Sequence, residues 1–140
     1  MKKFEFVEHT ADIGVKTYGR SPVELFQNSA EAMFSLLLDY DPKENFKKNI
    51  AIEAVSLEEL LVAWLNELLG LFYADKFLPA SFSIKIDDKP GLKSLAAILR
   101  GENFDPYDNK LSTEIKAATY HDLKIKKSGG DYWARIIFDV

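Results

Sequence analysis

The chain of 140 residues contains no cysteine, which excludes a disulfide framework and any metal site built from thiolates. That absence fits a reducing compartment, and we expect the protein in the cytoplasm. Proline and glycine are also scarce, with five and seven residues, so no segment has the composition of a linker between domains. We therefore expect residues 1–140 to form one domain around one core.

Long apolar runs and an excess of positive charge are missing too. No stretch is apolar for the roughly 20 residues that a membrane span needs, and no cleavage signal follows Met1. We therefore expect neither a membrane anchor nor a signal peptide. The formal net charge of −4 argues against a broad basic surface that grips nucleic acid directly, although it leaves room for a local basic patch. Any link to RNA should then be indirect.

A long apolar period is present at residues 55–72. Leucine and tryptophan recur there at the i, i+3, i+4 spacing that places them on one face of an α-helix. Ser56 and Glu59 have the spacing of a capping box, and Val55 is placed to form a staple with Leu60. We interpret the segment as the central core helix, with a cofactor-binding helix as the less favoured alternative. The polar face is assigned to Glu58, Glu59, Asn66 and Glu67.

A second amphipathic helix is predicted after Ser21 and Pro22, which combine a capping serine with proline at the first helical position. Short runs of alternating apolar residues predict strands around the two helices. These runs lie at residues 4–7, 13–17, 50–54, 82–86, 95–99, 123–125 and 132–140, with turns at 87–91 and 128–131 and a loop at 101–110. The pattern predicts an α+β fold, in which two amphipathic helices pack on one mixed, largely antiparallel sheet.

Carboxylates near both ends of the chain form the first candidate site. Asp12 lies at the junction of the first two strands, where an aspartate is often only a turn former. At the other end, the Asp139 side chain and the Val140 α-carboxylate are held close together and repel each other unless a cation lies between them. Three such oxygens would suit Ca²⁺ or Mg²⁺, whereas zinc prefers His and Cys. The alternative is an acidic end that pairs loosely with Lys116 or Arg135.

The second candidate site is the polar stretch before the last hairpin. Lys116, Thr119 and His121 fall close together there, although ordinary residues of an exposed strand edge would give the same pattern. The other histidine, His9, lies just before Asp12.

Several ordered motifs carry a resemblance to a known family. They are E-H-T-A-D-I-G-V from residue 8, S-L-E-E-L-L-V-A-W-L-N-E-L-L from residue 56, G-E at 101–102, E-I-K-A-A-T-Y-H from residue 114 and W-A-R-I-I-F-D-V at residues 133–140. In these motifs the chain closely resembles the archease family along nearly its whole length. Ordered motifs at consistent positions are far more specific than a single short pattern.

The resemblance implies a small cytoplasmic accessory protein without catalysis of its own. Such a protein activates the RtcB-type RNA ligase of tRNA splicing by promoting guanylylation and turnover of the ligase, and it broadens the nucleotides that the ligase accepts. The resemblance also implies a divalent cation, usually Ca²⁺, bound by Asp12, Asp139 and Val140, with Lys116 beside it. The other residues expected to contact the ligase or a nucleotide are His9, Thr119 and His121.

Two other functions are consistent with the residues. In the first, the chain is a hydrolase in which Asp12 and Asp139 hold Mg²⁺ and either His9 or His121 acts as the base. In the second, it is a chaperone-like accessory protein of another RNA-modifying enzyme. Activity of the chain alone would favour the hydrolase, whereas activity only with the ligase would favour the activator.

Overall fold

The computed structural model describes residues 2–7 and 12–140, so the expectations for His9 lie outside the described residues. The elements in chain order are β1 (Phe4–Val7), β2 (Ile13–Gly19), α1 (Pro22–Leu37), β3 (Phe46–Ala54), α2 (Leu57–Tyr73), β4 (Phe77–Lys89), β5 (Leu92–Asn103), β6 (Ala117–Ser128) and β7 (Asp131–Asp139). In this part of the chain, no helix has both the length and the apolar character needed to cross a membrane.

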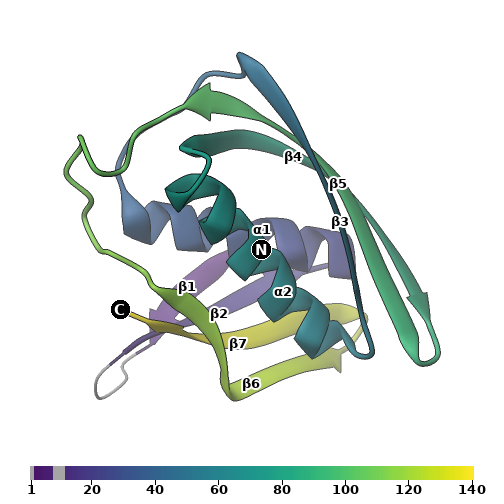
Figure 1. The fold of residues 1–140 in the computed structure, drawn as a ribbon. Coiled ribbons are helices and arrows are strands. Elements are labelled where there is room, and N and C mark those ends of the chain that lie inside the picture. Colours follow the sequence, from purple (N-terminus) through teal and green to yellow (C-terminus); the bar gives the residue numbers. More distant parts are fainter. Residues whose placement is uncertain (1, 8–11) are drawn as a thin grey trace.

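The strands form two antiparallel sheets, and both helices lie between them (Figure 1). One sheet has the order β1-β2-β7-β6, and the other has the order β3-β5-β4. The predicted α+β class, with two helices packed on antiparallel β-structure, is confirmed. The strands divide into two sheets, where one was expected, because alternation shows which face of a strand is buried and does not show which strand lies beside it. The two helices cover the apolar faces of both sheets.

The helix starts follow the predicted capping. The Ser21 hydroxyl accepts a hydrogen bond from the Glu24 N–H at 3.1 Å, and the Ser56 hydroxyl accepts one from the Glu59 N–H at 3.1 Å. The Glu59 carboxylate reaches back to the Val55 N–H at 3.4 Å. Val55 itself remains 65% exposed, so the predicted staple does not form.

The core lies between the sheets and contains few polar groups. Trp64 of α2 is fully buried, and its indole N–H donates to the Phe26 carbonyl of α1 at 3.1 Å. The buried hydroxyls of Thr17 and Ser29 lie 2.9 Å apart and join β2 to α1. These polar groups are satisfied by partners within the core, as buried polar groups must be.

The β4–β5 hairpin extends further at both ends than the sequence predicts. Asn103 still lies opposite Phe77, although residues 101–110 were expected to form a loop. At the other end Lys89 lies opposite Leu92, so the turn between the strands narrows to two residues, and its Gly91 has a φ of 75°. Polar residues can be part of these strands because the hydrogen bonds that pair β4 with β5 are formed by backbone N–H and C=O groups and do not depend on the side chain.

Candidate functional site

Asp12 and Asp139 lie at the same end of the β2–β7 pair. The pairing places Ile13 opposite Phe138; Asp12 directly precedes Ile13, and Asp139 directly follows Phe138. Asp12 is half-buried, and Asp139 is exposed. Side chains alternate between the two faces of a strand, and Phe138 is fully buried, so Asp139 projects to the face away from the helices. The fold thus brings together two carboxylates from opposite ends of the sequence.

Strand β6 flanks Asp139 on its other side. Ala117 lies opposite Asp139, and the Lys116 N–H donates to the Asp139 carbonyl at 2.8 Å. The Lys116 side chain is exposed at this end of the sheet. Among the residues that the structure describes, the ion pairs lie elsewhere, and none joins Asp139 to Lys116 or Arg135.

Gly14 has no side chain, and this allows β1 to pack closely against β2 and β7. A Cβ atom at Gly14 would lie 2.6 Å from a methyl carbon of Val7 and 3.3 Å from a methyl carbon of Ile137. Real Cβ atoms do not approach other atoms as closely as 2.6 Å. The glycine of the H-T-A-D-I-G motif therefore has a packing role two residues from Asp12.

Thr119 and His121 lie at a wide bulge in β6. Thr119 still lies opposite Ile137, but the next paired residue, Lys124, lies opposite Arg135, so four residues of β6 face one residue of β7. The Thr119 hydroxyl donates to the Ile137 carbonyl at 3.0 Å and accepts from the His121 N–H at 3.3 Å. These bonds give Thr119 a structural role in shaping the bulge.

The imidazole of His121 is exposed on this bulge. Its Nε2 lies 3.5 Å from a carboxylate oxygen of Asp122, whose φ is 52°. Asp122 is therefore one of the few non-glycine residues of the described chain in the left-handed region, a conformation often found at functional loops.

Two side chains of α2 hold the start of β6 in place. The Asn66 amide donates to the Ala118 carbonyl at 3.1 Å, and its oxygen accepts from the Ala118 N–H at 2.8 Å. The Tyr73 hydroxyl donates to the Ile115 carbonyl at 2.9 Å, and burial raises the pKa of this phenol above its ordinary value of 10. These three bonds fix the backbone on both sides of Lys116.

The sequence pattern missed the role of Asn66 and assigned it to the polar face of the helix. In the structure it is half-buried and turned toward β6. A signal was present, because Asn66 follows Val62 by four residues and precedes Leu69 by three, and both of these are buried.

The donor groups at this end of the sheet suit a hard cation. In residues 2–7 and 12–140, no three His, Cys, Asp or Glu side chains are grouped so that they could hold a metal. Asp12 and Asp139 supply two carboxylates, and a third oxygen would have to come from a backbone carbonyl or from the Val140 carboxylate. Oxygen ligands of this kind fit Ca²⁺ or Mg²⁺ better than zinc. The oxygen donors are of the type that a hard cation prefers, and the binding of a cation by Asp12, Asp139 and Val140 stays a prediction.

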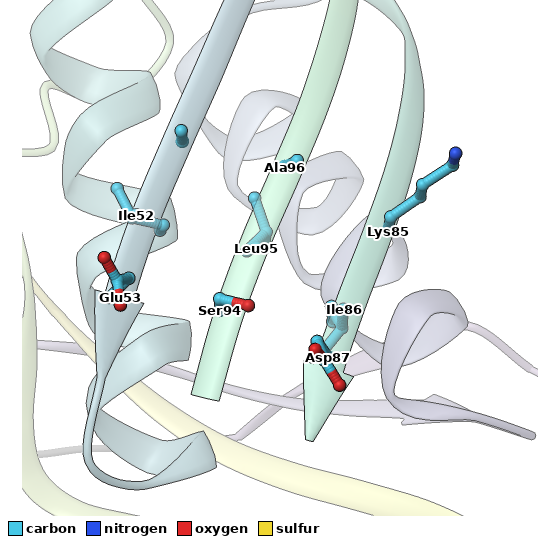
Figure 2. Close-up of a pocket in the computed structure, with 9 residues that line it drawn as sticks. Ile52, Glu53, Lys85, Ile86, Asp87, Ser94, Leu95 and Ala96 are labelled. Carbon is cyan, nitrogen blue, oxygen red and sulfur yellow. The ribbon is translucent and has the colours of Figure 1, made fainter. Parts of the chain in front are cut away.

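A hollow of about 530 Å³ lies elsewhere, on the three-stranded sheet. Figure 2 shows its side chains on β3, β5 and β4, with Lys85 pointing away from the others. Its charged groups are Glu53, Lys85 and Asp87, and none of the described candidate residues borders it. Because its polar groups do not converge on one point, we place the functional site at the end of the β2–β7–β6 strands.

The fold and these motifs together define a class of protein. It is an α+β domain with two helices between a four-stranded and a three-stranded antiparallel sheet, and with carboxylates at the end of its central strand pair. The model of the Archease protein family (MTH1598/TM1083) matches residues 4–140. The chain belongs to the archease family.

Individual relatives agree with the family match. Protein archease of Methanosarcina mazei is 37% identical over 141 residues, which cover 99% of this chain and 97% of that protein. Protein archease of Sulfurisphaera tokodaii is 38% identical over 143 residues and is covered completely, as is this chain. The resemblance seen in the sequence motifs is confirmed.

Two solved structures are similar to the chain. The solution structure of Methanobacterium thermoautotrophicum protein 1598 covers 100% of both chains with a TM-score of 0.84 and 33% identity. The crystal structure of an archease from Thermotoga maritima, described as a possible chaperone, has a TM-score of 0.63. The Thermotoga protein is 22% identical to this chain, and the match covers 96% of this chain and 94% of the Thermotoga chain. At this identity the likeness shows the fold alone.

Proposed function

We propose that this protein is a non-catalytic activator of an RtcB-type RNA ligase. It promotes guanylylation and repeated turnover of the ligase in the cytoplasm, broadens the nucleotides that the ligase uses, and acts on tRNA splicing through the ligase. Membership of the archease family supports the proposal, together with the motifs that carry the resemblance. The observation that carries it furthest is the gathering of Asp12, Asp139 and Lys116 at one end of the sheet.

Each residue at this end has a role in the proposal. Asp12, Asp139 and the Val140 carboxylate would hold a divalent cation, with Ca²⁺ as the first candidate. The cation would supply positive charge that stabilises and orients phosphate oxygens. Lys116 presents a second positive charge, on a backbone held by Asn66 and Tyr73, to a nucleotide phosphate or a ligase carboxylate.

The surroundings of this end suit contact with a partner protein better than catalysis by the chain alone. Asp139 and Lys116 are exposed at this end of the sheet, and Asp12 is half-buried. His121 lies on the adjacent bulge, next to Asp122, and would meet the same partner. A partner that covers this end would exclude water from the charged groups and strengthen their interactions.

The decisive experiment measures guanylylation of an RtcB-type ligase with GTP and a divalent cation, at one molecule of this protein per many molecules of ligase. A substoichiometric amount should speed repeated turnover, and the protein alone should neither hydrolyse GTP nor cleave phosphoesters. Lys116→Ala should reduce the stimulation, whereas Lys110→Ala, an exposed lysine in the loop before β6, should not. Phosphoester hydrolysis by the chain alone, or no effect on the ligase at any ratio, would refute the activator function.

A further inference from the structure

Basic side chains form a row across the four-stranded sheet. Lys16 of β2 lies opposite Arg135 of β7, and Arg135 lies opposite Lys124 of β6 on its other side. Their chain neighbours Ala134 and Ile136 are buried in the core. Because side chains alternate along a strand, the three cations project from the face that points away from α1 and α2 (Figure 1).

Aromatic rings form the next row of the same face. Tyr18, Trp133 and Lys126 lie side by side on the same three strands: Tyr18 and Lys126 follow Lys16 and Lys124 by two residues, and Trp133 precedes Arg135 by two on the antiparallel strand β7. The Lys16 ammonium lies 4.4 Å from the centroid of the Trp133 ring and 5.5 Å from that of Tyr18. The face thus combines four cations with two half-buried rings, which we call the basic aromatic face.

Ion pairs within the described residues do not neutralise three of the four cations of this face, Lys124, Lys126 and Arg135. Neighbouring strands are about 4.8 Å apart, so like charges in one row repel each other. Glu5 lies opposite Lys16, but its carboxylate also accepts bonds from Lys2 at 2.7 Å and from the Tyr18 hydroxyl at 2.6 Å.

Three acidic groups border the face: Glu5 of β1 lies beside Lys16 at one end of the basic row, and Asp131 and Asp139 lie near the two ends of β7. Asp131 lies beside the β6–β7 turn, two residues from Trp133. Asp139 lies four residues from Arg135, or about 13 Å along the strand. Positive charge is therefore concentrated in the middle of the face, although the whole chain has a net charge of −4.

We propose that the basic aromatic face binds single-stranded nucleic acid. Lys124, Arg135 and Lys16 contact successive phosphates, and Trp133 and Tyr18 provide surfaces on which bases stack. A phosphate that draws Lys16 away from Trp133 uncovers the indole for a base. The rings favour a nucleic acid over an acidic protein segment, because every base has a flat face that stacks on an aromatic ring.

This inference goes beyond ligase activation and does not depend on it, since the binding belongs to this chain alone. The expectation of no direct nucleic-acid contact rested on the total charge and left room for a local basic patch, and the basic aromatic face is such a patch. The arrangement of charges in the fold, and not their sum, decides whether a local patch attracts phosphates.

The test is fluorescence anisotropy of a labelled single-stranded RNA of about 12 nucleotides, titrated with the purified protein at several salt concentrations. Lys124→Ala combined with Arg135→Ala should weaken binding at least tenfold. The slope of log K against log salt should also fall in magnitude by about 1.4, because each phosphate contact in a single strand contributes about 0.7. The matched control, Lys47→Ala with Lys85→Ala, removes the same charge from exposed positions on the three-stranded sheet and should leave both quantities unchanged.

The aromatic part of the proposal has its own variants. Trp133→Leu should weaken binding by at least about fivefold with an unchanged salt slope, and Trp133→Tyr should restore most of the affinity. Circular dichroism and melting temperature establish that each variant folds. The proposal is overturned if the control pair weakens binding as much as the test pair, if the RNA does not bind at low salt, or if polyglutamate competes as well as unlabelled RNA. The last outcome would assign the face to an acidic polypeptide.

Discussion

Replacing Asn66 with alanine should loosen the edge of the sheet that carries the candidate site. Strand β6 is an edge strand, and the amide of Asn66 binds both the N–H and the carbonyl of Ala118. Ala118 is only 4% exposed, so water cannot readily replace a lost partner. The change therefore leaves one donor and one acceptor of the backbone unsatisfied.

The cost can be estimated from these two bonds. An unsatisfied buried polar group costs about 1–3 kcal/mol, so the loss of both partners in Asn66→Ala should lower the free energy of unfolding by about 2–6 kcal/mol. The entropy of unfolding for 140 residues is about 0.3 kcal/mol per degree, which converts this loss into a fall in Tm of about 7–20 °C. Asn66→Asp should also destabilise, because its carboxylate keeps the bond to the Ala118 N–H but repels the Ala118 carbonyl.

Urea unfolding and differential scanning calorimetry would measure the effect, with Asn49→Ala as the matched control. Asn49 is exposed on β3, and its loss should change stability by no more than about 0.5 kcal/mol. Hydrogen exchange should also show faster exchange at the start of β6 in Asn66→Ala. If Asn66→Ala matches Asn49→Ala within error, Asn66 does not anchor β6 and the reasoning is wrong.

Three further predictions concern the site and its surroundings. Calcium at about 100 times its dissociation constant should stabilise the protein by about 2.7 kcal/mol, or about 9 °C in Tm, and Asp12→Asn should abolish this gain while Asp131→Asn keeps it. If calcium raises Tm equally in the wild type, Asp12→Asn and Asp131→Asn, Asp12 holds no cation. Appending a few residues after Val140 should weaken the calcium response, because only a neutral carbonyl then remains at that position; an unchanged response would exclude the Val140 carboxylate as a ligand. Finally, bonds from the Lys43 N–H and the Tyr40 hydroxyl lower the pKa of Glu102 below its ordinary 4.5, so its contribution to stability is present above that pH and is lost as the pH falls through the lowered value. In Glu102→Gln, Tm should decrease less steeply below about pH 4.5 than in the wild type. An identical decrease of Tm in the two proteins would contradict this.

Part of the candidate site could be expected from the sequence, and part could not. Asp12, Asp139 and Lys116 were singled out from residue types and motifs, and the fold brings them to one end of the sheet. Thr119 was expected at the same contact, but its hydroxyl is used within the β6 bulge. A bulge depends on how many residues each strand places between its pairs, and a single strand's sequence does not contain that information.

By itself, the sequence determined the local elements of this protein. Spacings of three and four residues identified both helices, capping residues marked their starts, and the Gly129–Gly130 pair marked the last hairpin, where the φ values are 60° and 90°. The tertiary structure alone decided the division into two sheets, the contact of Asn66 with Ala118, and the row of Lys16, Arg135 and Lys124. Helix and turn signals are local, because they depend on neighbours a few residues away. Strand partners and register are set by the packing of the whole chain, so residues that meet across strands are known only once that packing is known.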